Sequence, residues 1–151
     1  MTEFRVFPFS PEDAAAVREL DRRTFSVPIP DSLLEELPEK ENMAFFVVKN
    51  DENTFCGYAG MMFVLDEAEV ISVAVKEEFR GLGCGTLLMD ALLEKCYEKE
   101  MSTLSLEVRE GNAPARRLYE KVGFTLEGVR KNYYSNPKEN ALIMTRLLKQ
   151  R

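Results

Sequence analysis

Hydrophobic and polar positions along the chain follow the two periods of regular secondary structure. Short hydrophobic runs, some alternating strictly with polar residues, predict strands. The predicted strands cover residues 2–9, 44–48, 54–64, 69–75, 103–108, 124–127 and 141–144. Apolar residues spaced three to four apart predict helices, which cover residues 11–22, 31–37, 86–100 and 115–122. This mixture of strands and helices predicts a fold of the α/β class.

Polar and small residues mark where several of these elements begin and end. Ser10 and Asp13 loosely form a capping box at the start of the first helix. Asp31 is expected to cap the short second helix, and Asn112 to cap the last one. Gly123 follows that last helix as its expected C-terminal stop. These signals support helices with defined ends.

The most informative segment runs from residue 73 to residue 88. The strand Val73-Ala74-Val75 leads through a charged turn to Arg80 and then to the glycine-rich loop 81–85, which opens a helix. The N-terminus of a helix presents backbone N–H groups that the helix itself does not use, so it attracts anions. Glycines let such a backbone approach a phosphate, because they carry no Cβ. The segment therefore predicts a pyrophosphate site.

Four interpretations of this loop compete. A P-loop would require Gly-Lys-Ser/Thr, whereas Gly85 is followed by Thr86 and a leucine. A dinucleotide fingerprint would require a third glycine at position 86 and a place near the first strand, and the chain offers neither. The spacing Arg80-x-x-Gly83-x-Gly85 fits a third motif, Arg-x-x-Gly-x-Gly/Ala. A strand–helix turn with incidental glycines is the fourth interpretation.

The downstream half supports the third motif. Its second signature consists of Leu106-Glu107-Val108-Arg109, Asn112, Ala115, Leu118-Tyr119 and Gly123-Phe124. On these residues the stretch 65–147 resembles the GNAT N-acetyltransferase superfamily. It is most similar to the RimI type, which acetylates the N-terminal alanine of a ribosomal protein, through residues 107–109, 130–134 and 141–144. The resemblance implies a GNAT fold, with a mixed, mostly antiparallel sheet of about seven strands flanked by about four helices. The chain departs from the RimI pattern at Gly111, where serine is usual, and at Asn140, where aspartate is usual.

The resemblance implies acetyl-CoA as cosubstrate and assigns residues to it. The pyrophosphate is expected on the backbone N–H groups of Gly81, Leu82, Gly83, Cys84, Gly85 and Thr86. Arg80 is expected either to help electrostatically or to be a plain surface arginine. The pantetheine is expected along Val73, Ala74 and Val75, with a bond to Asn112. Cys84 is either a reactive thiol at a helix N-terminus or simply the variable position of the motif.

Two further residues match the family's proton-transfer groups. The resemblance assigns Glu107 as general base and Tyr119 as general acid, and histidine is excluded because the chain has none. A free phenol, with a pKa of about 10, is well matched to a leaving thiolate. The alternatives are a solvated strand-end carboxylate for Glu107 and core packing for Tyr119. Glu69 is a second candidate base, since other GNAT enzymes place one on that strand.

The acceptor side of the site is less specific. Tyr133 and Tyr134 are expected between the last strands, where the RimI type builds part of its peptide site, or else in an ordinary strand pair. The loop 24–34 is expected to cover the acceptor, and its hydrophobic residues either line a pocket or pack normally. They are Phe25, Val27 and Ile29.

Composition narrows the function further. The chain has 151 residues, which suits one domain over residues 1–151, and a net charge of −6. That charge argues against nucleic-acid binding and suits a cationic acceptor, although acidity also serves solubility. Three unpatterned cysteines and no histidine argue against a metal and for a reducing cytoplasm. We find no signal peptide or membrane-spanning run, and we expect a monomer or weak dimer.

Three functions remain open at this point. The first is acetylation of a protein N-terminus, namely the N-terminal alanine of the eighteenth small-subunit ribosomal protein, as the RimI resemblance implies. The second is acetylation of a small amine such as a polyamine or an antibiotic. The third is a regulatory module that binds acyl-CoA without turnover. Intact Glu107, Tyr119 and Asn112 argue for an enzyme.

Overall fold

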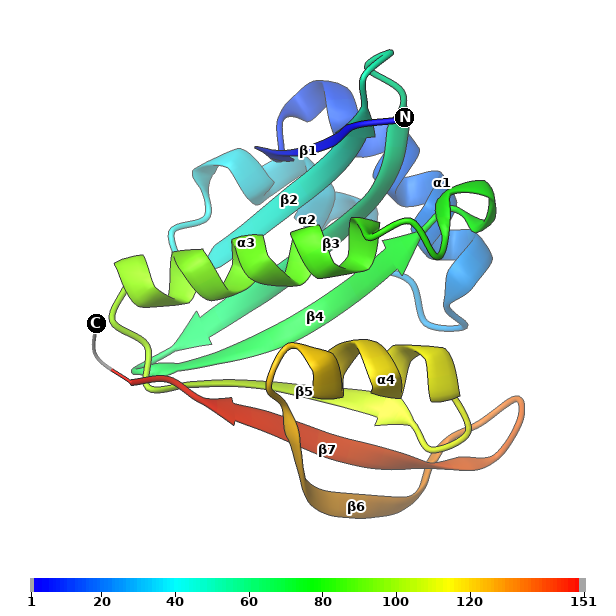
Figure 1. The fold of residues 1–151 in the computed structure, drawn as a ribbon, viewed down its shortest axis with the longest axis vertical. Helices are drawn as coiled ribbons and strands as arrows, with labels where there is room; N and C mark the ends of the chain where they lie inside the picture. The colour runs from blue at the N-terminus through cyan, green and yellow to red at the C-terminus, as the bar shows by residue number, and fades with distance from the viewer. Residues whose placement is uncertain (1, 150–151) are drawn as a thin grey trace.

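The computed structural model describes residues 2–149, in which seven strands form one sheet (Figure 1). The strands are β1 Phe4–Pro8, β2 Met43–Asn50, β3 Phe55–Val64, β4 Glu67–Val75, β5 Thr103–Arg109, β6 Thr125–Tyr134 and β7 Glu139–Leu147. Their order across the sheet is β1-β2-β3-β4-β5-β7-β6. Only the β4–β5 pair is parallel. The α/β class and the mixed, mostly antiparallel sheet of about seven strands are confirmed.

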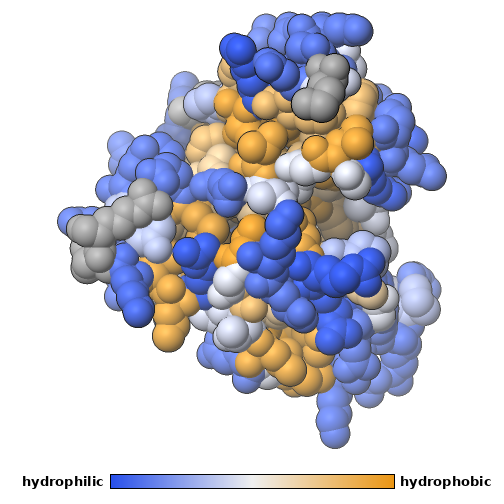
Figure 2. Space-filling view, viewed as in Figure 1, coloured by the Kyte–Doolittle hydropathy of each residue, from blue (hydrophilic) through white to orange (hydrophobic). Residues whose placement is uncertain are grey.

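Helices lie on both faces of this sheet. They are α1 Ala14–Thr24, α2 Asp31–Glu36, α3 Cys84–Glu98 and α4 Ala113–Lys121. Short 3-10 turns precede α1, follow α2 and follow β4, at Pro11–Asp13, Leu37–Glu39 and Glu77–Phe79. In Figure 1, α3 and α4 lie in front of the sheet and α1 and α2 behind it. Viewed from the α3 and α4 side, hydrophobic surface shows in the middle of the molecule between hydrophilic residues (Figure 2).

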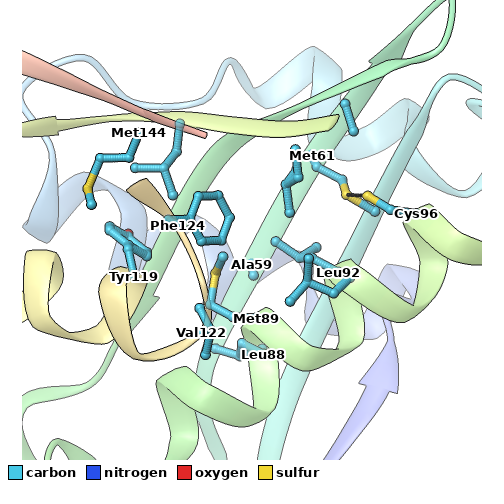
Figure 3. Packing of buried hydrophobic residues seen from close by; sticks show 14 of the residues in the cluster. Ala59, Met61, Leu88, Met89, Leu92, Cys96, Tyr119, Val122, Phe124 and Met144 are labelled. Carbon is cyan, nitrogen blue, oxygen red and sulfur yellow. Dashed lines mark hydrogen bonds between the residues drawn. The ribbon is translucent and has the colours of Figure 1, made fainter. Parts of the chain in front are cut away.

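The two faces of the sheet bury separate hydrophobic clusters. Beneath α3 and α4 the larger cluster includes Leu88, Leu92 and Phe124 (Figure 3). Leu106 of β5 belongs to the same cluster. The smaller cluster packs α1 and α2 against β2, β3 and β4. Because successive residues of a strand face opposite sides, β5 sends Leu106 into the larger cluster and its neighbour Glu107 to the other face.

The sheet opens between its two central strands. β4 and β5 pair at only three positions, from Glu67 opposite Thr103 to Glu69 opposite Ser105. Beyond Glu69, the rest of β4 has no strand beside it on this edge among the described residues. The pairing of β3 with β4 also shifts by one residue between Gly60 and Met61. The last residues of β4 therefore offer an open backbone edge that points toward the start of α3.

Most element ends agree with the sequence patterns, with two corrections. Asp13 accepts hydrogen bonds from the backbone N–H and hydroxyl of Ser10, which confirms the capping interaction. Asp31 does not cap α2: the cap is Pro30, and the Asp31 carboxylate instead pairs with arginines of α1. The last predicted strands are also too short, because β6 continues to Tyr134 and β7 spans Glu139–Leu147. Tyr133 and Tyr134 therefore lie within β6, as the strand-pair alternative has it, and not between the two strands.

Candidate active site

The loop after β4 takes the backbone conformation that its glycines allow. Gly81 and Gly83 have φ angles of +76° and +94°, which L side chains rarely adopt. A Cβ built on either residue would meet no atom within 4 Å, so the conformation, not the space, calls for glycine there. Gly83 caps α3 in this left-handed conformation.

This turn leaves backbone N–H groups available at the start of α3. The N–H of Leu87 bonds the carbonyl of Gly83, and the N–H groups of Cys84, Gly85 and Thr86 lie ahead of it, outside the helical ladder. Together with the positive end of the helix dipole, they form a cradle suited to an anion. The Nε of Arg80 donates to the carbonyl of Val75 at 3.0 Å. This hydrogen bond ties the residue before the loop to the end of β4.

Packing against the rest of the protein constrains two residues of the loop, Gly85 and Cys84. A Cβ on Gly85 would lie 2.9 Å from Cδ2 of Leu118, so Gly85 lets α4 approach α3 closely rather than only freeing space for a phosphate. Cys84 is 1% exposed, and burial raises its pKa to about 11. A thiol that stays protonated is a poor nucleophile, so the variable-position interpretation of Cys84 is the one that its surroundings favour.

The predicted pantetheine strand forms the open edge of the sheet. Val73, Ala74 and Val75 pair with β3 on one side and have no strand partner on the other within the described chain. Ala74 is buried against the α1 and α2 cluster, while Val73 and Val75 pack toward α3. An extended ligand could therefore pair with this edge as an additional strand does.

Asn112 stands at the start of α4 and has both predicted roles available to it. Its Oδ1 accepts from the N–H of Ala115 at 3.2 Å, which confirms the helix cap. The residue is exposed, and its side-chain NH2 has no partner among the described residues. The cap fixes the side chain while leaving two donors for a ligand.

The two carboxylate oxygens of Glu107 have different surroundings: one faces Arg130, and the other has no hydrogen-bond partner in the described chain. Its Oε1 lies 3.5 Å from Nε of Arg130. Its Oε2 is shielded from solvent and has no hydrogen-bond partner among residues 2–149. Removing a carboxylate oxygen from water without a partner is unfavourable, so this atom is suited to accept a proton or an N–H from a ligand.

The two tyrosines at the end of β6 lie beside Glu107. Their ring centroids are 5.1 Å apart in an edge-on arrangement. The negative charge of Glu107 is the main cause that raises the pKa of Tyr133, followed by hydrogen bonding to Glu107 and by burial, and Glu69 adds least. Burial, followed by the charge of Glu107, raises the pKa of Tyr134 to about 12. The structure thus brings Glu107, Tyr133 and Tyr134 together, with Glu69 at their margin.

Tyr119 reaches the same region from α4. It is 8% exposed and packs against Phe124, with ring centroids 6.0 Å apart, and beside Met144 (Figure 3). Burial, and to a smaller extent the nearby Tyr134, raise the pKa of Tyr119 to about 12. A free phenol has a pKa of about 10, so the buried phenol of Tyr119 is a weaker acid than the one expected from the sequence. Its hydroxyl bonds to no other residue in the described part of the chain.

The buried carboxylate of Asp21 anchors the loop between α1 and α2 through a hydrogen bond. Asp21 Oδ2 accepts from the N–H of Ile29 at 2.6 Å, and its Oδ1 accepts from Tyr58 Oη at 2.6 Å. Ile29 packs in the core, so it does not line a surface pocket. Phe25 and Val27 are exposed, the latter by 86%, so only these two remain available to an acceptor.

Two residues at the end of β5 and the start of β7 have a role that the sequence patterns did not assign, although Arg109 belongs to the family signature. Arg109 and Glu139 join the hairpin that carries the tyrosines to the β5–α4 junction. Asn140, one of the two departures from the RimI pattern, accepts the N–H of Asn132 and so supports the same hairpin. An arginine two residues after a candidate base, on the same face of its strand, was the available signal.

Neither a metal-binding cluster nor a membrane-spanning helix is present among residues 2–149. No three acidic or cysteine side chains in this part of the chain are gathered in a way that could hold a metal ion. None of its helices is both long and apolar enough to cross a membrane.

Comparisons with known proteins show the family and the fold. The acetyltransferase (GNAT) family profile matches residues 14–124. The chain is 40% identical over 134 residues to a Bacillus subtilis (strain 168) protein provisionally named a ribosomal protein bS18-alanine N-acetyltransferase, with 88% of each chain covered. A Haemophilus influenzae protein with that name unqualified is 36% identical over 135 residues, which cover 87% of this chain and 90% of the relative. The crystal structure of the ribosomal-protein-S18-alanine N-acetyltransferase from Escherichia coli has a TM-score of 0.85 at 26% identity and covers 99% of this chain and 96% of its own.

Proposed function

The chain belongs to the acetyltransferase (GNAT) family and is an acetyltransferase, and from this premise we propose that it acetylates the N-terminal α-amine of a protein with acetyl-CoA. The acceptor is the N-terminal alanine of ribosomal protein bS18, the acceptor for which its relatives are named. The reaction takes place in the cytoplasm, and residues 1–151 act as one catalytic unit. The observation that carries the proposal is the unpartnered, solvent-shielded Oε2 of Glu107 beside two tyrosines.

The cosubstrate fits the residues at the β4–α3 junction. Acetyl-CoA supplies an activated acetyl thioester. The free N–H groups of the loop 81–86 bind its pyrophosphate, and Arg80 adds positive charge nearby. The open edge at Val73–Val75 aligns the pantetheine arm, and the NH2 of Asn112 donates to it. A backbone N–H on that edge stabilises negative charge that develops on the thioester oxygen.

Glu107 acts as general base in this proposal. The attacking amine must be neutral, and the unused Oε2 accepts its proton directly or through a water molecule. Arg130, at the other oxygen, keeps the carboxylate oriented. Glu69 is exposed on β4 and is the weaker candidate, because nothing holds its carboxylate toward a reacting amine.

Tyr119 supplies the proton that the leaving thiolate needs. Because burial raises its pKa to about 12, the phenol stays protonated throughout the neutral range. The hydroxyl has no other partner in the described chain, so no hydrogen bond within the protein has to break before it donates. Tyr133 and Tyr134 form a wall for the acceptor's N-terminal residue.

The choice of an α-amine rather than a lysine rests on acidity. An α-amine has a pKa near 8 and a lysine near 10.4, so at pH 7 roughly 10% of the former is neutral and about 0.04% of the latter. Deprotonating lysine therefore costs about 3 kcal/mol more. One carboxylate base is adequate for the easier task.

Thiol release from acetyl-CoA tests the proposal. The acceptors are a short peptide that begins with alanine and its N-terminally blocked twin that carries a free lysine. We expect release only with the free N-terminus. Release with neither peptide but with a polyamine or an antibiotic would replace the protein acceptor by a small amine. Acetyl-CoA binding without release for any amine would indicate a module without turnover.

A further inference from the structure

Arg109 makes its polar contacts with the β6–β7 hairpin. Its Nη1 donates to the carbonyl of Pro137 at 2.9 Å and its Nη2 to the carbonyl of Ser135 at 3.1 Å. Nη1 also lies 3.3 Å from Oε1 of Glu139. The guanidinium carbon sits 4.3 Å from the ring centroid of Tyr134. The Arg109 side chain thus contacts three parts of the hairpin: the turn, the start of β7 and the Tyr134 ring at the end of β6.

Glu139 links the hairpin to the residues that precede α4. Its second oxygen, Oε2, accepts from the N–H of Gly111 at 2.6 Å. A Cβ on Gly111 would lie only 2.6 Å from that same oxygen. The glycine that departs from the RimI pattern therefore leaves room for the carboxylate to reach the backbone. Arg109 and Glu139 together clamp the hairpin to both sides of the β5–α4 junction.

The contact suits arginine specifically. The planar fork directs several N–H groups at once and also stacks on an aromatic face, which a lysine ammonium cannot do. The ion pair with Glu139 is only partly exposed, at 27% and 25% of the two side chains, so water competes with it less than at an open surface. Arginine thus couples the position of the Tyr134 ring to the backbone of the turn.

The clamped ring belongs to the proposed reaction centre. Arg109 follows Glu107 by two residues and shares its face of β5, because side chains alternate along a strand. The Tyr134 ring stacks on Arg109 and so lies on the face of β5 that carries Glu107, although its own strand is the edge of the sheet. Consistent with this position, Glu107 contributes to the raised pKa of Tyr134, and Tyr134 contributes to that of Tyr119.

We propose that Arg109 is a positioning residue that clamps the β6–β7 hairpin to the end of β5 and so holds Tyr134 beside Glu107 and Tyr119. This inference rests on the proposed function, because those two residues are the proposed base and acid. Without the guanidinium, the ring loses its stacking partner and the turn loses two hydrogen bonds. Acceptor use then suffers, while acetyl-CoA binding at the loop 81–86 does not.

A double-mutant cycle tests the route of the effect. In the wild-type background, Arg109→Met should lower kcat/KM for an alanine-initiated peptide by about tenfold or more, with the Kd for acetyl-CoA unchanged within about twofold. In a Tyr134→Leu background, the same change should lower kcat/KM by less than about threefold, because the ring it positions is gone. Arg109→Lys should not restore the wild-type rate, since lysine lacks the fork.

Arg146→Met is the matched control. Arg146 also donates to a backbone carbonyl of another element, that of Val122 at 2.8 Å, but near the opposite end of β7. Its removal should lower the melting temperature while leaving kcat/KM within about twofold of the wild-type value. Equal losses of kcat/KM in Arg109→Met and Arg146→Met would overturn the inference. So would a full tenfold loss from Arg109→Met in the Tyr134→Leu background.

A readout without turnover separates this inference from the proposed function. The chain has five tyrosines, so fluorotyrosine NMR can resolve each ring, with Tyr134→Phe assigning its signal. Arg109→Met should shift and sharpen the Tyr134 resonance, as expected for a released ring, and Arg146→Met should not. An unchanged resonance in Arg109→Met overturns the inference whatever the activity. A wild-type protein that ignores every N-terminal peptide overturns the proposed function, and the NMR result still decides the positioning.

Discussion

At the scale of single residues, the two candidate bases differ in how their oxygens are used. Glu107 has one oxygen near Arg130 and one that is shielded from water and unpaired in the described chain. A protein atom left in that state raises the free energy of the unliganded site, and a bound amine relieves it. Glu69 is exposed on β4 and carries no such unfavourable energy. The binding of an amine should therefore depend on Glu107.

Replacement of Glu107 by glutamine tests this dependence. The amide keeps the shape of the side chain but cannot take up the proton, so kcat should fall by about 10²-fold or more. The acetyl-CoA Kd from calorimetry should change by less than about twofold. Glu69→Gln is the control and should keep kcat within about threefold. A severe loss in Glu69→Gln with an active Glu107→Gln would exchange the two roles.

Tyr119→Phe removes the proposed acid without removing a hydrogen bond within the described chain. Thiol release should slow by about tenfold or more, while the melting temperature should change little. In the wild type, the pKa of about 12 means that Tyr119 stays protonated as the pH rises to about 10. The rate should therefore rise as the α-amine deprotonates near pH 8 and show no decline through Tyr119 below about pH 10. A decline centred at pH 8 to 9 that vanishes in Tyr119→Phe would contradict this assignment of the acid.

At the scale of elements, the sequence predicts well what neighbouring residues determine. The loop 81–86 could be predicted because its glycines, its helix start and the preceding strand are consecutive. The end of β6 was predicted only as one of two alternatives for Tyr133 and Tyr134, because its extension to Tyr134 depends on pairing with Glu139 of β7. The pairing of β6 with β7 is irregular between Arg130 and Tyr134, so the sequence has no alternation of hydrophobic and polar residues there that would indicate a strand.

The contacts that join distant segments were beyond the sequence. Gly111 and Glu139 are 28 residues apart, and Asp21 and Tyr58 are 37 residues apart. Each of these residues also has an ordinary local explanation as a turn, an edge or a core position. Only the fold brings the partners together, so the clamp on the hairpin and the carboxylate under the α1–α2 loop emerged from the structure.

Tyr58→Phe tests the anchoring of the α1–α2 loop. The hydroxyl bonds Asp21 at 2.6 Å and Ser72 at 2.7 Å inside the protein, so its removal should lower the free energy of unfolding by about 1–3 kcal/mol. Urea denaturation measures this loss. Tyr133→Phe removes the same atom from an exposed ring and should cost less than about 0.5 kcal/mol. Equal costs for the two variants would show that the buried hydrogen bonds do not stabilise the protein.

At the scale of the whole molecule, buried thiols and phenols set the response to alkali. Burial raises the pKa of Cys84 to about 11 from an ordinary value of 9.0, and that of Cys96 to about 12. Tyr119 and Tyr134 rise to about 12 from 10.0. These folded-state values exceed the unfolded ones, so the folded protein binds protons more tightly at high pH. Stability is then complete below the ordinary pKa values and is lost as the pH rises through the folded ones.

Unfolding in urea at a series of pH values measures this loss. Under reducing conditions, the free energy of unfolding should stay level up to about pH 8 and fall between about pH 9 and 12. Each group contributes a slope of at most about 1.4 kcal/mol per pH unit. Cys96→Ala should be less stable at pH 7, because it leaves a cavity, but should fall less steeply with pH. If the free energy of unfolding falls equally steeply with pH in the wild type and in Cys96→Ala, the ionisation of Cys96 does not contribute to the loss of stability.

The short seam between β4 and β5 is the place where the two parts of the sheet share the fewest backbone hydrogen bonds. In the described chain, three paired residues join β4 to β5, while the larger hydrophobic cluster packs side chains of both parts, such as Met61 and Leu106, into one core. Amides along the open edge of β4 should therefore exchange with deuterium faster than those of strands paired on both sides. A ligand that lines this edge and also bonds Asn112 touches both parts of the sheet. Its binding should slow exchange at the end of β4 and at the start of α4 together.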